Sequence, residues 1–367
     1  MYCKKELKIK HIFIIFTLIL VPALAPAATG KTKSHRPLNI TCQPIPSFSI
    51  PSILFLCGQP LPLHDRHCRE MLDRELTIAV YNHAQVVLWI KRSPRYFPLF
   101  SRKIKSLGLP IDLKYIAVSE SALLENIHSR AGAAGLWQFM RRTGRHLGLR
   151  INTDIDERLD PARATECALN YLKYLRDKFN SWPLALAAYN CGEKRVADAV
   201  KEQKTDDYHT LSLPTESERY LYRLAAIKLI LSNPGKYGYK IDQHNCYKPL
   251  PVDYINLKLK HKFSLIDFAL HLGTTYYELK KLNPHLINKR LPKGEFNLVL
   301  PQGYKDKVAG ILSSLTPLSS RRTRYLVRKG DTLSAISHRF NISVAHLKKI
   351  NRLNNAKIMV GQKLLLQ

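Results

Sequence analysis

The chain has 367 residues, which is enough for two or three domains with separate hydrophobic cores. Hydrophobic residues make up 45% and charged residues 23%, the composition of a globular protein rather than a disordered one. Lys and Arg number 58 against 28 Asp and Glu, a formal net charge of +30. Such a surface favours polyanions, namely nucleic acid, anionic lipid or a cell wall with free carboxylates.

The N-terminus has the three-part layout of a secretory signal peptide. A basic start is followed by an apolar run at residues 12–21 and by Ala25-Pro26-Ala27, which offers small residues for cleavage after Ala27. A transmembrane anchor is the alternative, but the run is short and is broken by Pro22 and Pro26. We therefore expect residues 1–27 to be a signal peptide, and an exported cationic protein to meet envelope polymers and no nucleic acid.

The cysteines fit export to an oxidising compartment. Removal of Cys3 with the signal leaves six of the seven, an even number that predicts either disulfides or free buried thiols, with the pairing left open. Cys57 and Cys68 bracket His64 and His67, but this spacing matches no standard zinc pattern. We expect no metal and no cofactor.

The middle of the chain predicts an all-α domain. Residues 28–68 are rich in Pro, Ser and Thr and predict an extended or loosely packed lead-in. Helical periodicity follows over residues 69–245, with a break at Pro94 and a core at about 109–240. Asp160-Pro161 begins one helix, and Thr215-x-x-Glu218 predicts a capping box at another.

The C-terminal third contains a duplicated strand–helix–helix–strand unit. At one constant offset, apolar residues and one asparagine of residues 252–304 match those of residues 323–367. The matched pairs are Leu265 and Leu333, Phe268 and Ile336, Leu272 and Phe340, Leu279 and Leu347, Leu282 and Ile350, and Asn283 and Asn351. We expect two small α+β modules joined by a flexible basic linker at residues 305–322.

The second copy resembles the LysM module, through Tyr-Leu-Val-Arg-Lys-Gly-Asp-Thr-Leu at residues 325–333 and Val-Gly-Gln-Lys-Leu at 360–364. Gly330 permits a tight turn, and Asp331 and Thr332 are expected to cap the first helix. The resemblance implies binding of N-acetylglucosamine-containing glycans at Asp331, Thr332, Leu333 and Asn354. The first copy resembles a degenerate LysM, since Lys262-Phe263 replace Gly330-Asp331, and its glycan binding is left open. A generic αβ adaptor is the alternative for both copies.

Glu120 is the candidate catalytic residue. It follows the apolar residues 115–118, and a carboxyl beside an apolar helix surface holds its proton to higher pH. Such a group is suited to general acid catalysis at neutral pH. An exposed glutamate at a helix end is the alternative, so Glu120 needs further motifs to support it.

Three further motifs follow in order: Ser-Arg-Ala-Gly-Ala-Ala-Gly-Leu-Trp-Gln at residues 129–138, Ala-Ala-Tyr-Asn-Cys-Gly at 187–192 and Pro-Thr-Glu-Ser-Glu-Arg-Tyr at 214–220. With the pair Glu120-Ser121 they resemble the lytic transglycosylase domain of the soluble and membrane-bound D types, which is related to goose-type lysozyme. The resemblance extends from about Cys57 to the C-terminus and implies a mainly α, lysozyme-like catalytic (SLT) domain followed by LysM modules. Cys191 departs from the family, which usually has alanine there.

The resemblance also implies a reaction. Glu120 would protonate the oxygen between N-acetylmuramic acid and N-acetylglucosamine, then take the proton of the muramoyl C6 hydroxyl, leaving a 1,6-anhydro end without water. Glycosidases normally use two carboxylates. We interpret the motifs as leaving Glu120 to act alone, so two-carboxylate hydrolysis is not favoured.

The resemblance assigns substrate contacts to Ser129, Gln138, Tyr189, Asn190 and Tyr220. Ser129 would bond near the carboxyl and the sugar, and the amides would donate to and accept from sugar groups. Tyr189 and Tyr220 would floor the groove and orient Glu120. Trp137 either packs on a sugar face or fills the core.

We expect a monomer in the cell envelope, periplasmic or outer-membrane-associated, that binds peptidoglycan glycan strands and associates peripherally with the membrane. Basic residues beside the groove predict a partly electrostatic attachment to the wall; they are Arg130, Arg141, Arg142 and Arg145. Two alternatives are kept: a lysozyme-like muramidase that admits water, and a non-catalytic wall-binding protein.

Overall fold

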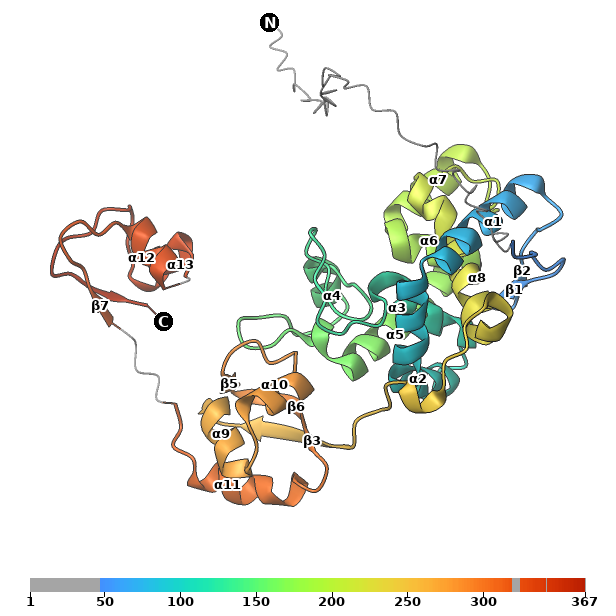
Figure 1. Cartoon of the computed structure of the whole chain (residues 1–367). Helices are drawn as coiled ribbons and strands as arrows, with labels where there is room; N and C mark the ends of the chain where they lie inside the picture. The colour runs from blue at the N-terminus through green and yellow to red at the C-terminus, as the bar shows by residue number, and fades with distance from the viewer. Residues whose placement is uncertain (1–46, 319–323, 341, 367) are drawn as a thin grey trace, which may run out of the picture. The chain divides into compact units, whose positions relative to one another are not determined.

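The computed structural model describes residues 47–318, 324–340 and 342–366 (Figure 1). The predicted signal peptide, the first part of the lead-in, Cys3 and Cys42 lie outside the described residues. Within the described ranges, no helix is both long enough and apolar enough to cross a membrane. The five cysteines in these ranges are all free thiols.

Residues 47–245 form the helical domain, and the expected mainly α fold is confirmed. Its helices are α1 (Arg66–Tyr81), α2 (His83–Ser106), α3 (Lys114–Ser121), α4 (Arg141–His146), α5 (Pro161–Phe179), α6 (Trp182–Cys191), α7 (Glu193–Gln203) and α8 (Thr215–Ser232). Short 3-10 helices lie at Ile111–Leu113 (η1), Glu157–Leu159 (η2), Pro234–Tyr237 (η3) and Gln243–Asn245 (η4). As predicted, Asp160 caps α5, accepting hydrogen bonds from the backbone N–H groups of Ala162 and Arg163.

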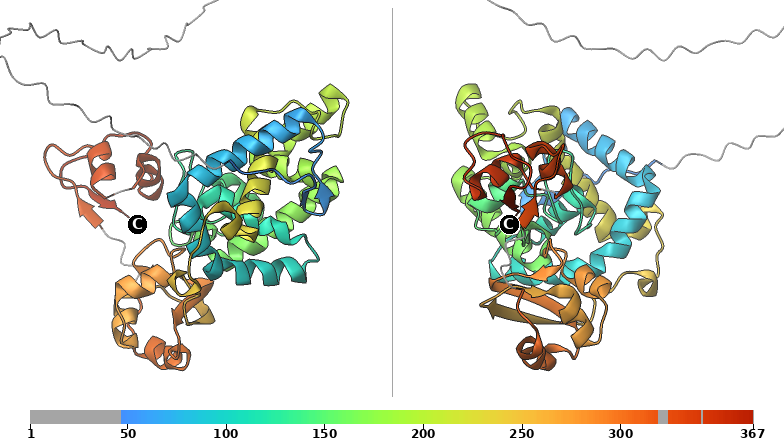
Figure 2. Two further views of the ribbon diagram at one scale, coloured as in Figure 1. Left: turned by 45° about the vertical axis from the view of Figure 1, so that its right-hand side comes forward. Right: turned by 90° about the vertical axis from the view of Figure 1, so that its left-hand side faces the viewer.

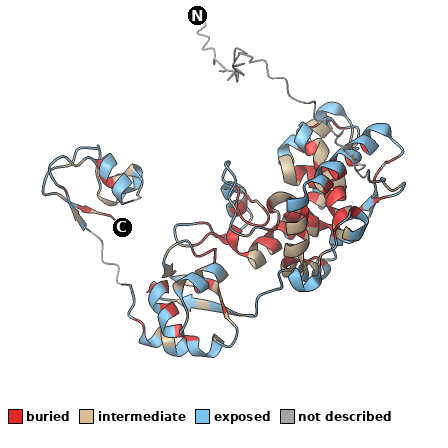
Figure 3. Cartoon of the chain, in the orientation of Figure 1, coloured by how far each residue is buried: buried red, intermediate tan, exposed pale blue. Residues whose placement is uncertain are grey.

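Helix α8 lies at the centre of this domain and packs against α1, α3 and α6 (Figure 2). Half of its residues are buried, and these include Tyr220, Leu224 and Ile227. Such a helix is apolar on several sides because its neighbours surround it. Buried residues are accordingly concentrated on the inner faces of the helices (Figure 3).

The break expected at Pro94 is wrong, because α2 continues through both Pro94 and Pro98. Proline lacks the N–H that would bond the carbonyl four residues earlier. Here that carbonyl, on Ile90, accepts a hydrogen bond of 3.1 Å from the Ser93 hydroxyl instead. The chain breaks earlier, at Asn82, whose side chain caps α2 by accepting from Gln85 N–H.

The capping box expected at Thr215 and Glu218 is also wrong. Helix α8 has Pro214 at its N-cap, so Thr215 is already its first helical residue. The Glu218 carboxylate accepts instead from the Leu213 N–H at 2.9 Å, outside the helix. The N–H groups of Ser217 and Glu218, in the first turn of α8, donate hydrogen bonds to the Pro214 carbonyl.

The lead-in is not loosely packed over residues 54–63. Strands β1 (Phe55–Leu56) and β2 (Gln59–Pro60) form an antiparallel hairpin. Its apolar side chains, Leu54, Leu56, Leu61 and Leu63, are buried in the core of the helical domain. The Asp112 carboxylate fixes the hairpin, because it accepts from the Cys57 N–H at 2.8 Å and pairs with Lys228 at 2.8 Å.

The first module occupies residues 252–318 and has its own core. Strand β3 (Val252–Leu259) pairs antiparallel with β6 (Gly294–Pro301), and β4 (Phe263–Ser264) pairs with β5 (Arg290–Leu291). Helices α9 (Leu265–Leu272) and α10 (Tyr276–Leu282) lie between them in the sequence. The second module, residues 324–366, contains β7 (Arg324–Leu326), α12 (Leu333–Arg339), α13 (Val344–Ile350) and β8 (Lys363–Leu365), with β7 antiparallel to β8.

Asn283 and Asn351 make the same hydrogen bonds in the two modules. Each side-chain nitrogen donates to the carbonyl four residues earlier and to a carbonyl of the last strand, of Val299 and Leu365 respectively. Each side-chain oxygen accepts the N–H of that same strand residue. The amide thus ties the second helix to the last strand in both copies, which supports the predicted duplication.

The linker expected at residues 305–322 is wrong for its first part. A further helix, α11 (Val308–Ser314), packs on α9, and Val308 and Leu315 are buried in the core of the first module. Leu318 then donates its N–H to the Lys262 carbonyl at 2.7 Å. Residues 319–323 lie outside the described residues.

Candidate active site

Glu120 is the penultimate residue of α3 and is half-buried. The four residues before Ser119 on that helix, 115–118, are buried as expected from their apolar character. Burial raises the pKa of the Glu120 carboxyl, and this effect outweighs the hydrogen bond from Tyr220 and the positive charge of Arg223, which both lower it. The carboxyl therefore retains its proton to higher pH than an exposed glutamate.

Tyr220 is the partner of Glu120. Its hydroxyl donates a hydrogen bond of 2.6 Å to Glu120 Oε1, from the buried face of α8. Burial and the neighbouring Glu120 charge raise the pKa of Tyr220 well above its ordinary value, so this phenol remains a donor. Glu120 Oε2 has no hydrogen bond within the described residues and is the oxygen left for a substrate.

A charged network surrounds this pair on α1 and α8. Glu75 is only 4% exposed, and its carboxylate pairs with Arg74 at 2.6 Å, Arg219 at 2.7 Å and Arg223 at 3.4 Å. Burial of a carboxylate is tolerated when several cations and hydrogen bonds compensate it. The network holds Arg223, one turn after Tyr220, where its charge acts on the Glu120 carboxyl.

The fourth motif contains two further carboxylates that bear on whether Glu120 acts alone. Glu218 accepts from the Leu213 backbone and is committed to that contact. Glu216 lies close enough for its charge to act on Glu120, but its side chain is 68% exposed and pairs with Arg223 at 3.1 Å. Neither makes a hydrogen bond with Glu120.

The Gln138 loop, residues 132–139, has a backbone that requires glycine at position 135. Gly135 has φ +79°, and a Cβ there would lie 1.9 Å from the Arg158 carbonyl oxygen. Gln138 has φ +48°, and its side-chain nitrogen donates to the Gly135 and Ile127 carbonyls. Its amide oxygen has no partner within the described residues, so Gln138 presents an acceptor only.

Arg158 holds this loop in position. It forms a buried bidentate pair with Asp156, at 2.9 and 2.7 Å. Its remaining nitrogen donates to the Gly132 carbonyl at 2.8 Å and the Phe139 carbonyl at 3.0 Å, which are the two ends of the Gln138 loop. Paired and fully hydrogen-bonded, the guanidinium is a rigid connector rather than a free charge.

The third motif contributes a tyrosine and an amide. Tyr189 donates to the Trp137 carbonyl at 2.8 Å, which ties α6 to the Gln138 loop. Asn190 accepts at its side-chain oxygen from the buried Ser217 hydroxyl at 2.8 Å. Its side-chain nitrogen has no partner among the described residues and remains a donor. The two amides thus have complementary roles, since Gln138 can accept and Asn190 can donate.

Comparison with known proteins agrees with this geometry. Residues 105–212 match the family model of the transglycosylase SLT domain, and residues 325–367 match that of the LysM domain. Over 323 residues the chain is 31% identical to membrane-bound lytic murein transglycosylase D of Escherichia coli strain K12, covering 83% of this chain and 69% of that protein. The chain belongs to the lytic murein transglycosylases.

Two other similarities cover less of the chain. It is 32% identical over 133 residues to the peptidoglycan transglycosylase gp16 of Escherichia phage T7, covering 35% of this chain and 10% of that protein. Among solved structures, the 70 kDa soluble lytic transglycosylase from Escherichia coli superposes with a TM-score of 0.34 at 24% identity, covering 45% of this chain and 30% of that one.

Trp137 fills the core of this lytic transglycosylase and does not stack on sugar. The side chain is 0% exposed, and its Nε1 donates to the Thr165 hydroxyl at 3.0 Å. The Phe100 ring contacts it edge-on, with centroids 5.3 Å apart. Of the two uses left open for Trp137, the structure selects core packing.

The two serines of the motifs make local contacts. Ser129 is exposed, and its hydroxyl accepts from the Ala133 N–H at 3.0 Å, closing the turn before the Gln138 loop. Ser121 is buried, and its hydroxyl donates to the Ala117 and Leu136 carbonyls at 2.9 Å each. It joins α3 to the Gln138 loop. The contact of Ser129 with sugar stays a prediction.

The four expected glycan contacts of the second module differ in environment. Thr332 caps α12 as predicted, accepting from the Ala335 N–H at 3.1 Å. Asp331 does not cap that helix: it accepts from the Tyr325 hydroxyl and the Arg328 N–H and closes the preceding turn. Leu333 is buried in the module core, whereas Asn354 is exposed. Their glycan contacts stay a prediction.

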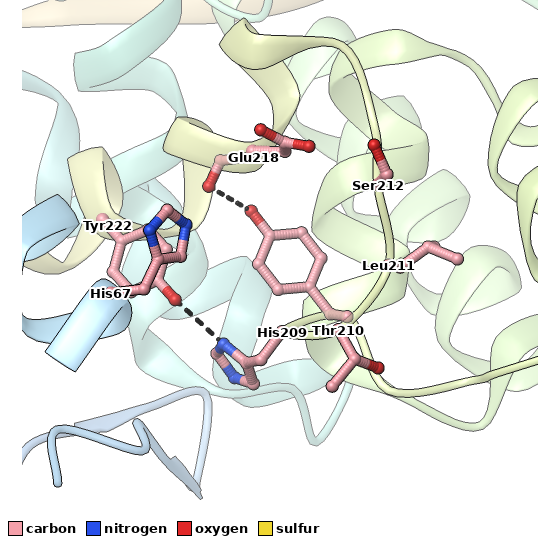
Figure 4. A pocket seen from close by; sticks show the side chains of 8 residues that line it. His67, His209, Thr210, Leu211, Ser212, Glu218 and Tyr222 are labelled. Atoms are coloured by element: carbon pink, nitrogen blue, oxygen red, sulfur yellow. Dashed lines mark hydrogen bonds between the residues drawn. The ribbon is translucent and has the colours of Figure 1, made fainter. Parts of the chain in front are cut away.

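His67, His209 and Tyr222 line a small pocket of about 220 Å³ (Figure 4). The His209 Nδ1 is 3.8 Å from the Cys68 sulfur and 3.0 Å from the Tyr222 hydroxyl. Within the described residues, no group of three or more His, Cys, Asp or Glu side chains is arranged to hold a metal ion.

Sequence reasoning did not single out Arg158, Glu75 or Ser217, although each holds a site residue in place. Arg158 follows Asp156 by two residues, a common spacing with no special signal in a single sequence. Glu75 and Ser217 act through partners more than 25 residues away, Arg219 and Asn190. Only the fold reveals these contacts.

Proposed function

We propose that this lytic transglycosylase cleaves the β-1,4 bond between N-acetylmuramic acid and N-acetylglucosamine in peptidoglycan without water, with Glu120 as both acid and base. The observation that carries the proposal is the hydrogen bond between Tyr220 and Glu120 Oε1, which leaves Oε2 free. A protonated Glu120 would donate from Oε2 to the bridging oxygen as the glycosidic bond breaks. The raised pKa of Glu120 supports this first step.

The second step uses the same residue in its ionised form. The Glu120 carboxylate, stabilised by the Tyr220 donor, takes the proton of the muramoyl C6 hydroxyl, and the C6 oxygen bonds to C1. This closes a 1,6-anhydro ring on the N-acetylmuramic acid and returns the proton to Glu120, whereas the N-acetylglucosamine released in the first step retains the first proton in its new C4 hydroxyl. The Gln138 oxygen and the Asn190 nitrogen supply an acceptor and a donor for sugar hydroxyl and N-acetyl groups.

Hydrolysis by a muramidase is the second candidate, because Glu216 lies close enough to act electrostatically on Glu120. An inverting glycosidase needs a second carboxylate that activates water. Glu216 is exposed and paired with Arg223, which lowers its value as a base for a bound water. We therefore favour the single-carboxylate route.

Mass analysis of digested sacculi separates the candidates. The wild-type protein is expected to release muropeptides with anhydro ends, each one water lighter than the hydrolysed product. Glu120→Gln serves as the matched control, since it retains the shape and loses the proton. Products with a full complement of water would instead indicate the muramidase.

The remaining assignments concern the location of this activity. The predicted signal peptide at residues 1–27 and the similarity to a membrane-bound transglycosylase support a place in the cell envelope. The LysM match of the second module supports attachment to glycan strands. We infer a monomer with peripheral membrane association, to be tested by sedimentation with and without membranes.

A further inference from the structure

The glycan-contact positions expected in the second module have counterparts in the first that face the protein interior. At the constant offset between the copies, Asp331, Leu333 and Asn354 correspond to Phe263, Leu265 and Leu286. All three counterparts are buried, whereas Asn354 is exposed; Ser264, the counterpart of Thr332, is half-buried, and Leu265 and Leu333 are core residues in both modules. The surface of the first module that corresponds to the expected glycan contacts is therefore largely covered.

The cover is a segment of the helical domain, residues 153–156, here called the Asp154 segment. Ile155 pairs with Leu286 as an antiparallel bridge. On either side, Asp156 donates its N–H to the His285 carbonyl and Ile287 donates its N–H to the Asp154 carbonyl, both at 2.9 Å. The Ile155 side chain is 3% exposed and packs in the core of the first module. The module thus binds this segment as it would an added strand.

Charged and polar side chains anchor the same segment. Lys262 stands where the second module has Gly330, and its ammonium lies 2.6 Å from the Asp154 carboxylate. Arg290 lies 3.6 Å from the same carboxylate, and Asn288 donates to the Thr153 carbonyl at 2.6 Å. Burial opposes ionisation of Asp154, but the Lys262 and Asn288 hydrogen bonds outweigh it and lower the pKa of Asp154. Lys262, which replaces the glycine of the second module, therefore also anchors the Asp154 segment to the first module.

The Asp154 segment leads directly to the candidate active site. Its last residue, Asp156, forms the buried pair with Arg158, which donates to both ends of the Gln138 loop. A continuous chain of contacts thus runs from Lys262 through residues 154–158 to the loop that presents Gln138. Displacement of reacting groups by about 1 Å is enough to slow catalysis.

We propose that the first module is a positioning element of the catalytic domain: its groove holds the Asp154 segment in place of glycan and thereby fixes the Gln138 loop. Lys262 and Asp154 are positioning residues in this arrangement, since they act through Arg158 and do not touch substrate. The effect on turnover rests on the proposed function. The effect on the loop does not, and the two are measured separately.

The test uses the full chain and charge reversal. Lys262→Glu places two carboxylates together, and the double variant Lys262→Glu with Asp154→Lys restores an opposite pair. Lys293→Glu is the matched control, because Lys293 is an exposed residue of the same module and the charge change is the same. Turnover on short soluble glycan fragments is measured together with amide hydrogen exchange at Ala134 and Gly135, whose N–H groups bond within and beside the loop.

Lys262→Glu is expected to lower kcat about tenfold with little change in KM, and to speed exchange at Ala134 and Gly135. The double variant should recover both in part, because Arg290 then faces a second cation, and Lys293→Glu should change neither. Where Lys262→Glu does not fold, Asn288→Ala removes one anchor without a charge clash and is expected to speed the same exchange to a smaller extent.

Two results would overturn the proposal. One is wild-type exchange at Ala134 and Gly135 in Lys262→Glu, which would show that the module does not brace the loop. The other is loss of protection at the Ile287 and Asp156 amides when N-acetylglucosamine tetramer is added to the wild type, because glycan would then displace the segment. Faster exchange with unchanged kcat would overturn the proposed effect on turnover and contradict the sugar contact proposed for Gln138, while the bracing of the loop would stand.

Discussion

The Tyr220 hydroxyl donates a hydrogen bond of 2.6 Å to the Glu120 carboxyl and so joins two residues that are 100 positions apart in the chain. Both side chains are desolvated, and burial raises the pKa of each. The Glu120 carboxyl therefore holds its proton to higher pH than an exposed glutamate, and the Tyr220 phenol remains a donor that fixes its orientation.

Replacement of Glu120 by Gln should abolish cleavage and leave the fold and wall binding intact. Glutamine retains the shape but cannot donate a proton, so we expect a loss of at least ~10²-fold in muropeptide release. Release is followed by chromatography of digested sacculi, with circular dichroism and sacculus sedimentation as controls. Release near the wild-type rate would remove Glu120 from the mechanism.

The same substitution should alter the pH dependence of stability. The folded-state pKa of Glu120 lies above its ordinary value of about 4.5, so its contribution to stability is complete below that value and is lost as pH rises through the raised pKa. Glu120→Gln has no such loss. Its Tm relative to wild type should therefore increase with pH above 4.5 and be flat below it. A Tm difference that is constant from acid to neutral pH would contradict the raised pKa.

Tyr220→Phe should separate orientation from acidity. The hydrogen bond from Tyr220 lowers the pKa of Glu120, so its removal should raise that pKa further and move the alkaline limb of the activity profile to higher pH. A hydrogen bond to a charged group contributes about 1.5–3 kcal/mol, which corresponds to a loss of kcat of roughly tenfold to a hundredfold. Tyr222→Phe, on the same helix beside His209, is the control. An unshifted profile would show that Tyr220 does not act on Glu120.

Deletion of residues 323–367 should weaken sacculus binding and spare activity on short soluble glycans. The second module contains none of the catalytic motifs, so it contributes local concentration rather than chemistry. Parallel assays on insoluble sacculi and soluble fragments test this. Equal losses on both substrates would place the module in the active site.

Wall association should weaken with added salt. A net charge of +30 would attract the carboxylates of the stem peptides. Salt weakens such an attraction, because exposed charges are screened beyond ~10 Å at 0.1 M salt. Arg130, Arg141, Arg142 and Arg145 are all exposed, as this requires. The Arg145 guanidinium also donates two hydrogen bonds to the Ile151 carbonyl, so it is less free to contact the wall. Sedimentation with sacculi over a salt series is the measurement, for the full chain and the deleted form. A retained fraction that does not change with salt in either form would leave the charge without this role.

Local patterns in the sequence carried much of this description. Glu120 stood out because four apolar residues precede it, and Asp160 because an acidic cap followed by proline marks a helix start. The duplication was visible because the same helix-facing positions recur, with Asn283 and Asn351 at equivalent places. Such signals lie within a few residues of one another, so they survive in a single sequence.

Other expectations were wrong where a contact that the local pattern does not show overrode the local rule. Pro94 does not break α2, since the Ser93 hydroxyl satisfies the carbonyl that proline leaves. Residues 305–318 are not a linker, since Val308 is buried in the core of the first module. In each case a contact outside the local pattern compensates the cost that the pattern predicts.

The sequence by itself determined the order of motifs, the catalytic candidate and the succession of a helical domain and two modules. Only the tertiary structure decided that Tyr220 faces Glu120, that Arg158 holds the Gln138 loop, that Trp137 is core, and that the Asp154 segment covers the first module. The reason is physical: burial and charge pairing set the pKa of Glu120 and fix the site, and both depend on which distant residues the fold brings together.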